Sequence, residues 1–595
     1  MKLTKIYSNK NNIFNPVTFN EGFNVVFAEI KLRENQDKDT HNLGKSRLMD
    51  LIDYCLLKER NPSFFLFKYF ERFKDFIFFL ELKLNNGKYL TVKRPVSSNT
   101  KISIKIHKEK EQDFTLSGDK FWDYFDIPID TAKLILDANF NLKSISPWDY
   151  RTAINYALRN QDDFSDIFKL SNFLGRHLHW KPYVGKILGF NADNLKRNYE
   201  LIYDIEKSKE LLTELRLDIG EILGDEEEVL TGLLDIKNKE SESLQKQLDT
   251  FNFDKVDAEN INKLVSEIDE DISELNKVKY YLSANIRKHN NTLKDEKINL
   301  KTSLTQKLFE EAGIIFDGQI KKSYDDLIEF KRKITTERKK YVKVKVKELE
   351  DELNSITNKL KELNISRSQK LSYLNKIGTF DKYKEVTSML LSIKTEINDI
   401  NRKLTLSKKI SETEEKISAN EKEQSIIKAL IKDNREEVTK DKQCIYNSIK
   451  TLFSIFVLDV LDKNAFISTK QNKEGNLEFY AGIMGDTGEQ TGESDGHSYK
   501  KILCMGYDLS VSLAYSNADF VRFIYHDGGL ETLDERKKKA FLNFVRTYSE
   551  LFGIQYILTV IDSDMPSGVN FSDEEIVLNL HDNGQSGRLF KMPSW

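Results

Sequence analysis

Proline is nearly absent from the middle of this sequence. The chain has 595 residues but only eight prolines, and none lies between Pro182 and Pro566. Because proline removes a backbone donor and breaks helices, a gap of this length favours long, uninterrupted helices. The length alone would suggest roughly three or four domains. The missing proline instead indicates fewer globular parts, with helices between them.

Cysteines and long apolar runs are also scarce. The three cysteines, Cys55, Cys444 and Cys504, are far apart in the sequence, which indicates neither a disulfide framework nor a zinc knuckle. No apolar run approaches the roughly eighteen residues of a membrane span, and the first residues, MKLTKIYSNKNNIF, lack the apolar core of a signal peptide. We therefore expect a soluble, cytoplasmic protein with no membrane partner.

The chain lacks an excess of charge of either sign. Lysine and arginine together number 92, and aspartate and glutamate number 95. A balance so close to neutral neither predicts nor excludes a nucleic-acid partner. The densest basic run, KRKITTERKKYVKVKVKE at residues 331–348, could contact phosphates, but a solvated face of a helix explains it equally well.

What the sequence does contain changes twice along the chain. Residues 1–190 are rich in aromatic side chains, and the runs FNVVFAEI, DFIFFLELKL, KYLTVKRPV and KISIKIHK predict strands. Residues 191–441 consist mainly of Lys, Glu, Leu, Ile, Asn and Ser. In residues 442–595 glycine and aromatic residues return, AFISTKQNKEGNLEFYAGIM predicts a hairpin, and FVRFIYHD and IQYILTVI predict buried strands.

The middle part has the apolar spacing of a coiled coil. An outgoing series comprises Ile261, Leu264, Ile268, Ile272, Leu275, Val278, Leu282 and Ile286, and a returning series comprises Leu349, Leu353, Ile356, Leu360 and Leu363. The spacing predicts an antiparallel hairpin that turns near residues 306–330. If each arm holds about 110 helical residues, it is on the order of 150 Å long. The alternative is a helical bundle folded back on itself.

The two globular ends predict one head. Strands occur in both, and a hairpin between them returns the chain to its starting point. We therefore expect an α/β head assembled from an N-terminal lobe (1–190) and a C-terminal lobe (442–595), with the coiled-coil hairpin (191–441) inserted between them.

The segment DKDTHNLGKS, residues 37–46, resembles a phosphate-binding loop. The pattern G-x-x-x-x-G-K-[ST] is satisfied at Gly44, Lys45 and Ser46, but Asp39 stands where the first glycine is expected. In such a loop the backbone N–H groups and the lysine bind phosphates, and the hydroxyl binds Mg²⁺. The context fits, because a predicted strand precedes the loop and an amphipathic helix follows it. A G-K-S triplet also arises by chance, so a second site has to decide.

Two segments near the C-terminus provide that second site. In FIYHDGGLETLDER an apolar strand delivers Asp527 at its end, where a carboxylate can help to hold Mg²⁺, and Asp534 precedes a predicted helix. Upstream, GESDGHSYKKILCMGYDLSVSLA places Ser494, Gly496 and Ser498 before a helix, a position suited to binding phosphate.

These segments together resemble the SMC, RecN and SbcC group of coiled-coil ABC ATPases. Over nearly the whole chain the sequence is most similar to a bacterial subfamily associated with ABC three-component systems in anti-phage defence. DKDTHNLGKSRL resembles the enlarged phosphate loop of that subfamily, with Asn42 two residues before Gly44, and FIYHDGGLETLDER resembles its His-Asp strand. YRTAINYALRNQDDF and GRLF are supporting matches.

The resemblance implies an ABC-type head that uses ATP and Mg²⁺ and forms a homodimer through its heads. It also implies DNA as a partner, together with an accessory subunit and a nuclease or other effector. The residues expected at ATP are Asn42, Gly44, Lys45, Ser46, Arg47, Ser494, Gly496 and Asp534, and those expected at Mg²⁺ are Ser46 and Asp527.

The sequence departs from the family at the hydrolytic position. ABC heads usually carry a glutamate directly after the metal-binding aspartate, but this chain has Gly528. Turnover is therefore expected to be slow, partner-dependent, or supported by another residue, for which His526, Glu531 and Glu535 are candidates. The switch histidine is also missing, since Asp562, Ser563 and Asp564 follow the next strand.

These observations predict an ATPase that couples engagement of its heads to DNA sensing and to an effector in anti-phage defence. Three alternatives stay open: a DNA-repair ATPase that works with a nuclease, a nucleotide sensor that does not hydrolyse ATP, and a structural tether.

Overall fold

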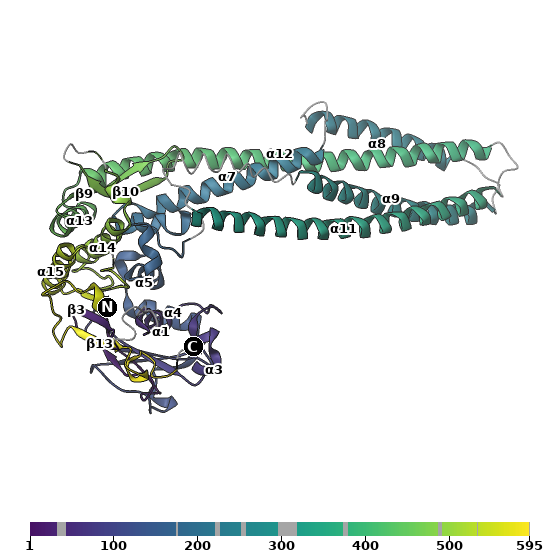
Figure 1. Ribbon diagram of the computed structural model, residues 1–595. Helices are drawn as coiled ribbons and strands as arrows, with labels where there is room; N and C mark the ends of the chain where they lie inside the picture. Colours follow the sequence, from purple (N-terminus) through teal and green to yellow (C-terminus); the bar gives the residue numbers. More distant parts are fainter. Residues whose placement is uncertain are drawn as a thin grey trace. The chain divides into compact units, whose positions relative to one another are not determined.

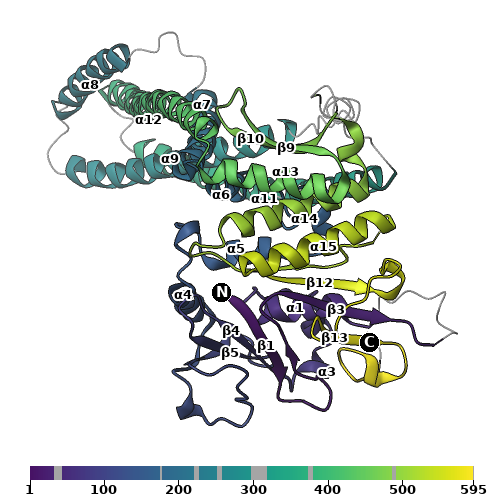
Figure 2. The same cartoon turned by 90° about the vertical axis from the view of Figure 1, so that its left-hand side faces the viewer.

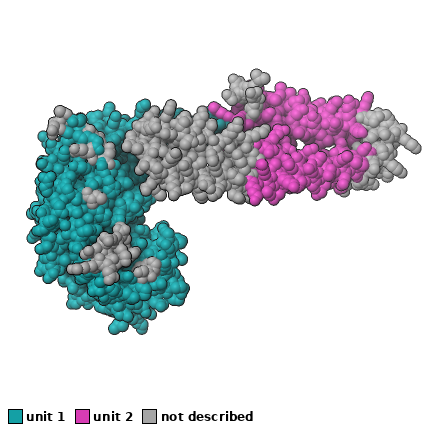
Figure 3. All heavy atoms as spheres, in the orientation of Figure 1, with its two compact units in different colours: residues 1–213, 413–595 teal, residues 214–412 magenta. Residues whose placement is uncertain are grey.

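The structure is a computed structural model, and it divides the chain into two compact units. Unit 1 comprises residues 1–213 and 413–595, and unit 2 comprises residues 214–412 (Figure 3). The residues that the structure describes are 1–32, 43–173, 177–219, 227–250, 257–295, 318–372, 379–485, 489, 491–531 and 533–593.

A five-stranded parallel sheet forms the centre of unit 1. Its strands, in spatial order, are β13 (Ile576–His581), β3 (Phe23–Glu29), β12 (Gln555–Ile561), β11 (Phe523–His526) and β8 (Leu158–Arg159). All four pairings are parallel. Strands β3 and β12 are apolar and buried along nearly their whole length, as expected for a parallel sheet with both faces covered. Because β3 and β8 come from one end of the chain and the other strands from the opposite end, neither lobe can form this sheet alone.

A six-stranded antiparallel sheet belongs to the N-terminal lobe. Its strands, in spatial order, are β2 (Val17–Thr18), β1 (Lys2–Ser8), β4 (Ile77–Lys83), β5 (Tyr89–Pro95), β6 (Lys101–His107) and β7 (Tyr124–Pro128). The predicted strands in this region are confirmed. A separate hairpin, β9 (Asn464–Gln471) with β10 (Leu477–Met484), confirms the predicted one.

Helices cover the parallel sheet and connect the two sheets. Helix α1 (Lys45–Cys55) packs against β3 and also against β4 and β5 of the antiparallel sheet. Helices α14 (His497–Ala514) and α15 (Glu535–Phe552) lie beyond β12 on one face of the parallel sheet, with α13 (Ile445–Leu461) outside them (Figure 2). The shorter helices are α2 (Phe65–Lys68), α3 (Phe70–Phe73), α4 (Ile129–Phe140), α5 (Tyr150–Ala157) and α6 (Lys181–Ile187).

The predicted fold class is confirmed by this arrangement. An α/β head is assembled from both ends of the chain, and long helices are inserted between its two lobes. The inserted helices are α7 (Ala192–Ile219), α8 (Glu227–Asp249), α9 (Asp257–Asp295), α11 (Gly318–Ser372) and α12 (Thr379–Lys440).

The bases of two inserted helices belong to unit 1. The division falls after residue 213 in α7 and before residue 413 in α12, whereas the sequence predicts lobe boundaries at residues 190 and 442. Contacts explain the difference. Arg197 of α7 donates two hydrogen bonds to Glu423 of α12, at 2.6 and 2.8 Å, and the amide of Asn198 donates to Asn476 of the β9–β10 hairpin at 2.6 Å.

Within unit 2 the outgoing and returning apolar series meet. Helices α9 and α11 pack side by side (Figure 1), and their shared core contains Ile268, Ile272, Leu282, Ile356 and Leu360. The predicted antiparallel pairing of these two series is therefore confirmed. Part of the predicted turn, residues 306–317, lies outside the described residues.

A single extended hairpin does not account for unit 2. Lys237 of α8 pairs with Glu396 of α12 at 2.9 Å, and the guanidinium of Arg402 of α12 lies 5.1 Å from the ring centroid of Tyr280 of α9. In an extended hairpin α12 would face α8 but not α9. The expected arm of about 150 Å is therefore wrong for this unit, and the folded-back bundle describes it.

The helices of the described residues can be compared with the length and composition of a membrane span. No single helix there is long and apolar enough to cross a membrane. One pair of helices, Lys382–Lys440 and Ile445–Leu461, meets the length and composition requirement jointly, with a bend of 54° between its members.

Candidate functional site

The phosphate-loop segment ends in a backbone conformation that only glycine adopts easily. Gly44 has a φ of 101° and precedes the first turn of α1. A Cβ at this position would lie 2.8 Å from Cβ of Leu589, and Leu589 N–H donates to the carbonyl of Leu43 at 3.0 Å. No side-chain hydrogen bond caps the helix, and an uncapped helix start behind a glycine suits an anion.

The approach to this loop is fixed at its start. The N–H groups of Lys31 and Leu32 donate to Asp582 at 2.8 and 3.2 Å, which ties the chain leaving β3 to the end of β13. Asn42, predicted at ATP, and Asp39, which replaces the expected glycine, lie outside the described residues. The segment GRLF contains Leu589, so its position against Gly44 gives that sequence match a structural reason.

Ser46 and Asp527 meet although 481 residues separate them. The Oγ of Ser46 donates to Oδ2 of Asp527 at 2.5 Å. Asp527 follows β11 at the carboxyl edge of the parallel sheet and is only 2% exposed. Its other oxygen, Oδ1, accepts a hydrogen bond from Oγ1 of Thr559 at 2.6 Å, and Thr559 Oγ1 accepts from Gly528 N–H at 2.7 Å. The carboxylate is thus held in a fixed orientation.

Lys45 is a buried lysine whose pKa is affected by the charges of three carboxylates. Lys45 is only 7% exposed. Burial lowers the pKa of Lys45, and the charges of Asp527, Glu531 and Asp564 oppose this decrease. The resemblance assigns Lys45 to the β- and γ-phosphates.

A loop at the end of β11 brings a glutamate to the position beside Asp527. Gly528 has a φ of 70°, and a Cβ there would lie 2.9 Å from Oε1 of Glu531 and 2.7 Å from Nε2 of Gln161. Gln161 Nε2 donates to Glu531 Oε1 at 3.2 Å. Lys501 Nζ donates to the carbonyl of Gly528 at 2.8 Å and lies 3.6 Å from Oε2 of Glu531.

His526 faces the interior of the protein instead of the site. Its Nδ1 lies 2.5 Å from the hydroxyl of Tyr556, and its Nε2 lies 3.1 Å from Oδ2 of Asp508. The residue is fully buried, and burial lowers the pKa of its imidazole. Asp508 is also held by Arg159 through two hydrogen bonds of 2.6 and 3.0 Å. With both ring nitrogens occupied, the candidate role of His526 as a catalytic group is not supported by its position.

Glu535 and Asp534 are engaged at the start of α15. Oε2 of Glu535 accepts the N–H of Ser567 at 2.7 Å, and this bond lowers the pKa of the exposed carboxyl. Asp534 is the N-cap of α15, and its carboxylate accepts the N–H of Lys537 at 3.0 Å. The site therefore brings Glu531, but not Glu535, next to Gly528. Arg47, also predicted at ATP, is exposed and pairs with Asp50 at 2.7 Å.

The predicted signature residues lie before α14. Ser494 is buried in the short 3₁₀ turn Gly492–Asp495, and its Oγ accepts the N–H of Ile483 at 2.8 Å. Gly496 is the N-cap of α14, and no side-chain hydrogen bond caps the helix. The helix start is suited to an anion, whereas the hydroxyl oxygen of Ser494 is already bonded to β10.

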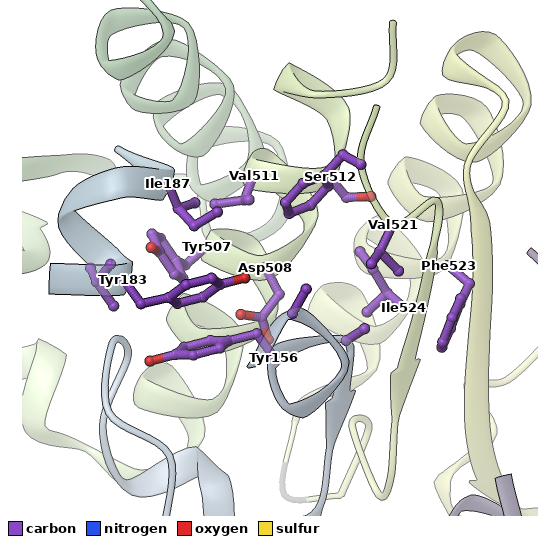
Figure 4. Close-up of a pocket in the computed structure, with 14 residues that line it drawn as sticks. Tyr156, Tyr183, Ile187, Tyr507, Asp508, Val511, Ser512, Val521, Phe523 and Ile524 are labelled. Atoms are coloured by element: carbon purple, nitrogen blue, oxygen red, sulfur yellow. The ribbon is translucent and has the colours of Figure 1, made fainter. Parts of the chain in front are cut away.

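A cavity elsewhere in unit 1 is too small to hold a nucleotide. It has a volume of about 40 Å³ and is mainly apolar, with Asp508 and Ser512 among its polar members (Figure 4). Such a volume holds roughly one or two water molecules. None of the residues predicted at ATP lines it.

Three residues of the site were not predicted from the sequence. They are Gln161, Lys501 and Thr559. The match of YRTAINYALRNQDDF contains Gln161 and could have indicated it, whereas Lys501 and Thr559 carry no local signal because their partners are distant in sequence. Within the described part of the chain, no group of three or more His, Cys, Asp or Glu side chains is arranged to hold a metal ion by itself.

The basic run is only partly described. Lys343, Lys345 and Lys347 are exposed, whereas Val342 and Val346, about one helical turn apart, are buried. The exposed lysines give this part of α11 a solvated basic face, and Lys345 pairs with Glu348 at 2.9 Å.

One family matches part of the chain. Its description is "Uncharacterised protein conserved in bacteria (DUF2326)", and it covers residues 454–594. The matched segment includes Asp527 but not Lys45. No curated protein matches the sequence.

Several solved structures are similar over most of the chain. The Smc head domain with a coiled coil and joint from Pyrococcus yayanosii is 14% identical, covers 94% of this chain and 92% of its own, and has a TM-score of 0.34. The Smc head domain with an extended coiled coil from Pyrococcus furiosus, bound to the C-terminal domain of ScpA, is 11% identical. It covers 95% of this chain and 90% of its own, with a TM-score of 0.34. The recombination mediator protein RecF is 11% identical, covers 96% of this chain and 96% of its own, and has a TM-score of 0.28. At such TM-scores these structures say nothing about the activity of this chain.

Proposed function

We propose that this protein is an ATPase whose nucleotide site is built jointly by the two ends of the chain. ATP binds with its phosphates at the start of α1, where Gly44 and the first turn of the helix receive them. Lys45 neutralises the β- and γ-phosphates. The observation that carries the proposal is the hydrogen bond of 2.5 Å between Ser46 and Asp527, because a phosphate loop and a metal-binding carboxylate have to meet in this way.

The same pair fits Mg²⁺. This ion prefers hard oxygen ligands and usually takes only one or two from the protein, with water and phosphate oxygens completing its shell. Ser46 offers a hydroxyl and Asp527 a carboxylate, which Thr559 orients. Bound Mg²⁺ would supply charge neutralisation of the phosphates. The contact between the two side chains supports their assignment as ligands of one ion.

The proposed ATPase acts as a dimer of heads. The start of α14, with Ser494 and Gly496, and Asp534 at the start of α15 would contact the nucleotide held by the opposite head. Ser494 is expected to exchange its bond with Ile483 for the phosphate when the heads engage. The motif order along the chain supports this arrangement.

We propose further that head engagement is coupled to DNA and to a partner effector in bacterial antiviral defence, in the cytoplasm. The resemblance of the phosphate loop and of FIYHDGGLETLDER to the defence-associated subfamily supports this role. The repair ATPase is the second candidate, favoured by the same coiled-coil insert. DNA binding by either would weaken steeply with salt.

Equilibrium binding of ATP in the presence of Mg²⁺ tests the proposed site. Lys45→Ala removes the charge that contacts the phosphates, and charge-assisted bonds contribute about 1.5–3 kcal/mol. The dissociation constant is therefore expected to rise roughly 10- to 100-fold. Lys120→Ala, at an exposed position of the same lobe, serves as the matched control and should bind like wild type.

The result also separates the alternatives. Failure of the wild-type protein to bind ATP would contradict the proposal and favour a tether. Tight binding without any phosphate release under multiple turnover would favour the sensor.

A further inference from the structure

We infer that Glu531 is the carboxylate that activates water for hydrolysis, in place of the residue that follows Asp527. This inference rests on the proposed nucleotide site. The sequence offers three candidates for the role and gives no reason to choose among them, whereas the geometry of the loop after β11 singles out one.

The carboxylate of Glu531 occupies the space that a side chain at Gly528 would need. An ideal Cβ at Gly528 would come within 2.9 Å of Glu531 Oε1. The left-handed backbone at Gly528, with its φ of 70°, turns the chain so that the residue three positions later reaches back. Glu531 thus presents its carboxylate beside Gly528, although it stands three positions later in the chain.

Glu531 is held firmly but remains accessible. Gln161 donates to one carboxylate oxygen at 3.2 Å, and Lys501 lies 3.6 Å from the other. The side chain is 30% exposed, so water reaches it. Its charge also opposes the lowering of the Lys45 pKa that burial causes.

Gln161 and Lys501, which hold Glu531, are themselves fixed by the fold. Gln161 follows β8, whose Arg159 is buried and accepts the N–H of Asp527 with its carbonyl at 3.1 Å. Lys501 is 3% exposed and comes from the second turn of α14. Both are positioning residues, because they act through Glu531.

The proposed reaction is hydrolysis of the bond that joins the γ-phosphate of ATP to its β-phosphate. Glu531 accepts a proton from the water whose oxygen attacks the γ-phosphorus of ATP. The bond between that phosphorus and the oxygen bridging it to the β-phosphorus breaks, and ADP leaves with the electron pair. Glu531 then releases the proton to solvent. Removing a general base commonly lowers the rate by about 10²- to 10⁴-fold.

A purely structural role for Glu531 makes a different prediction. If the glutamate only neutralised the buried Lys501, then the phosphate release lost by replacing Glu531 alone would return when both residues are replaced by neutral ones. If Glu531 activates water, the double variant Glu531→Gln/Lys501→Gln stays inactive. Coupling of this kind is what a double-mutant cycle measures.

The test compares Glu531→Gln with the matched control Glu535→Gln, in which a neighbouring exposed glutamate is changed in the same way. ATP dissociation constants and multiple-turnover phosphate release are measured for each. We expect Glu531→Gln to bind ATP within about threefold of wild type and to release phosphate at least about 10²-fold more slowly. Glu535→Gln is expected to resemble wild type in both measurements.

Each other result overturns the inference. Equal phosphate release by Glu531→Gln and wild type, or recovery of release in the double variant, shows that Glu531 does not activate water. ATP binding by wild type without any phosphate release also shows that Glu531 does not activate water. Absence of ATP binding by wild type overturns the proposed function as well, so the two failures are distinguishable.

A second variant covers the case in which Glu531→Gln does not fold. Glu531→Asp keeps the negative charge opposite Lys501 but withdraws the carboxylate by one methylene. Folding is checked by the thermal unfolding midpoint. The inference requires that Glu531→Asp, with a midpoint close to that of wild type, also loses most phosphate release while keeping its ATP affinity.

Discussion

At the scale of single residues, Thr559 connects the two functions of the loop after β11. Its hydroxyl donates to Asp527 at 2.6 Å and accepts the N–H of Gly528 at 2.7 Å. One buried side chain therefore orients the proposed metal ligand and fixes the turn that brings Glu531 back. Neither link is visible in the sequence, because Thr559 lies in the middle of an apolar strand.

Thr559→Val is expected to weaken Mg²⁺-dependent ATP binding. The substitution leaves a buried carboxylate oxygen and a buried N–H without partners, a loss of about 1–3 kcal/mol. We expect roughly 5- to 100-fold weaker binding with Mg²⁺ and a much smaller change with EDTA. Thr559→Ser keeps the hydroxyl and should restore the affinity. An equal defect with and without Mg²⁺ would contradict the assigned role.

The cysteines give a pH-dependent prediction. Burial raises the pKa values of Cys55 and Cys504 to about 12, and both are fully buried, whereas Cys444 is half-buried. Only the thiolate reacts with alkylating reagents. Native protein is therefore expected to label at Cys444 alone from neutral pH up to about pH 9, and all three cysteines should label after denaturation. Rapid labelling of Cys504 in native protein would contradict the burial.

The site residues differ in how far the sequence alone could predict them. Gly44, Lys45 and Ser46 form a contiguous motif whose chemistry depends on local backbone, and Asp527 ends a recognisable strand. Their contact required the fold. The orientation of His526 could not be predicted, because an apolar strand that ends in His-Asp does not reveal that the imidazole meets Asp508 and Tyr556 in the interior.

At the scale of elements, the helical insert shows what periodicity can and cannot determine. The apolar spacing identified α9 and α11 as partners, because two stripes of matching length bury one another. It did not determine whether that pair continues α8 and α12 or folds back on them. The arrangement depends on contacts between the outer faces of the helices, such as that of Arg402 with Tyr280. The residues that make these contacts do not recur at a regular spacing in the sequence.

Crosslinking tests the folded-back arrangement. Cysteines at Tyr280 and Arg402, introduced with Cys444→Ser to remove the accessible native thiol, are expected to crosslink efficiently with a short bismaleimide. The guanidinium and the ring are 5.1 Å apart, whereas in an extended hairpin α9 would lie beyond α8. A cysteine pair at Lys237 and Glu396, whose side chains form an ion pair in both arrangements, is the control. Crosslinking of the control pair alone would contradict the bundle.

At the scale of the whole molecule, the parallel sheet requires both ends of the chain. Strand β3 lies between β13 and β12, and β8 adds to the far edge of β11. The sequence predicted this joint head because strands, helical hairpin and strands succeed one another in that order. It could not predict the strand order, which depends on pairings between residues hundreds of positions apart.

ATP is expected to change the oligomeric state of the full-length chain. With Mg²⁺ and ATP, Glu531→Gln should form a dimer that light scattering detects, because bound ATP persists between the heads. Gly496→Trp, which fills the start of α14, should bind ATP but remain monomeric. Dimerisation that is equally strong without nucleotide would contradict ATP-driven head engagement.

The joint site is tested most directly by a double-mutant cycle on the Mg²⁺ dependence of ATP affinity. Ser46→Ala and Asp527→Asn come from opposite ends of the chain, and each is expected to remove most of the gain in affinity that Mg²⁺ provides. If both residues hold the same ion, the double variant is expected to be little worse than either single variant. Losses that add independently, or wild-type affinity that is unchanged by Mg²⁺, would contradict a single site shared by the two lobes.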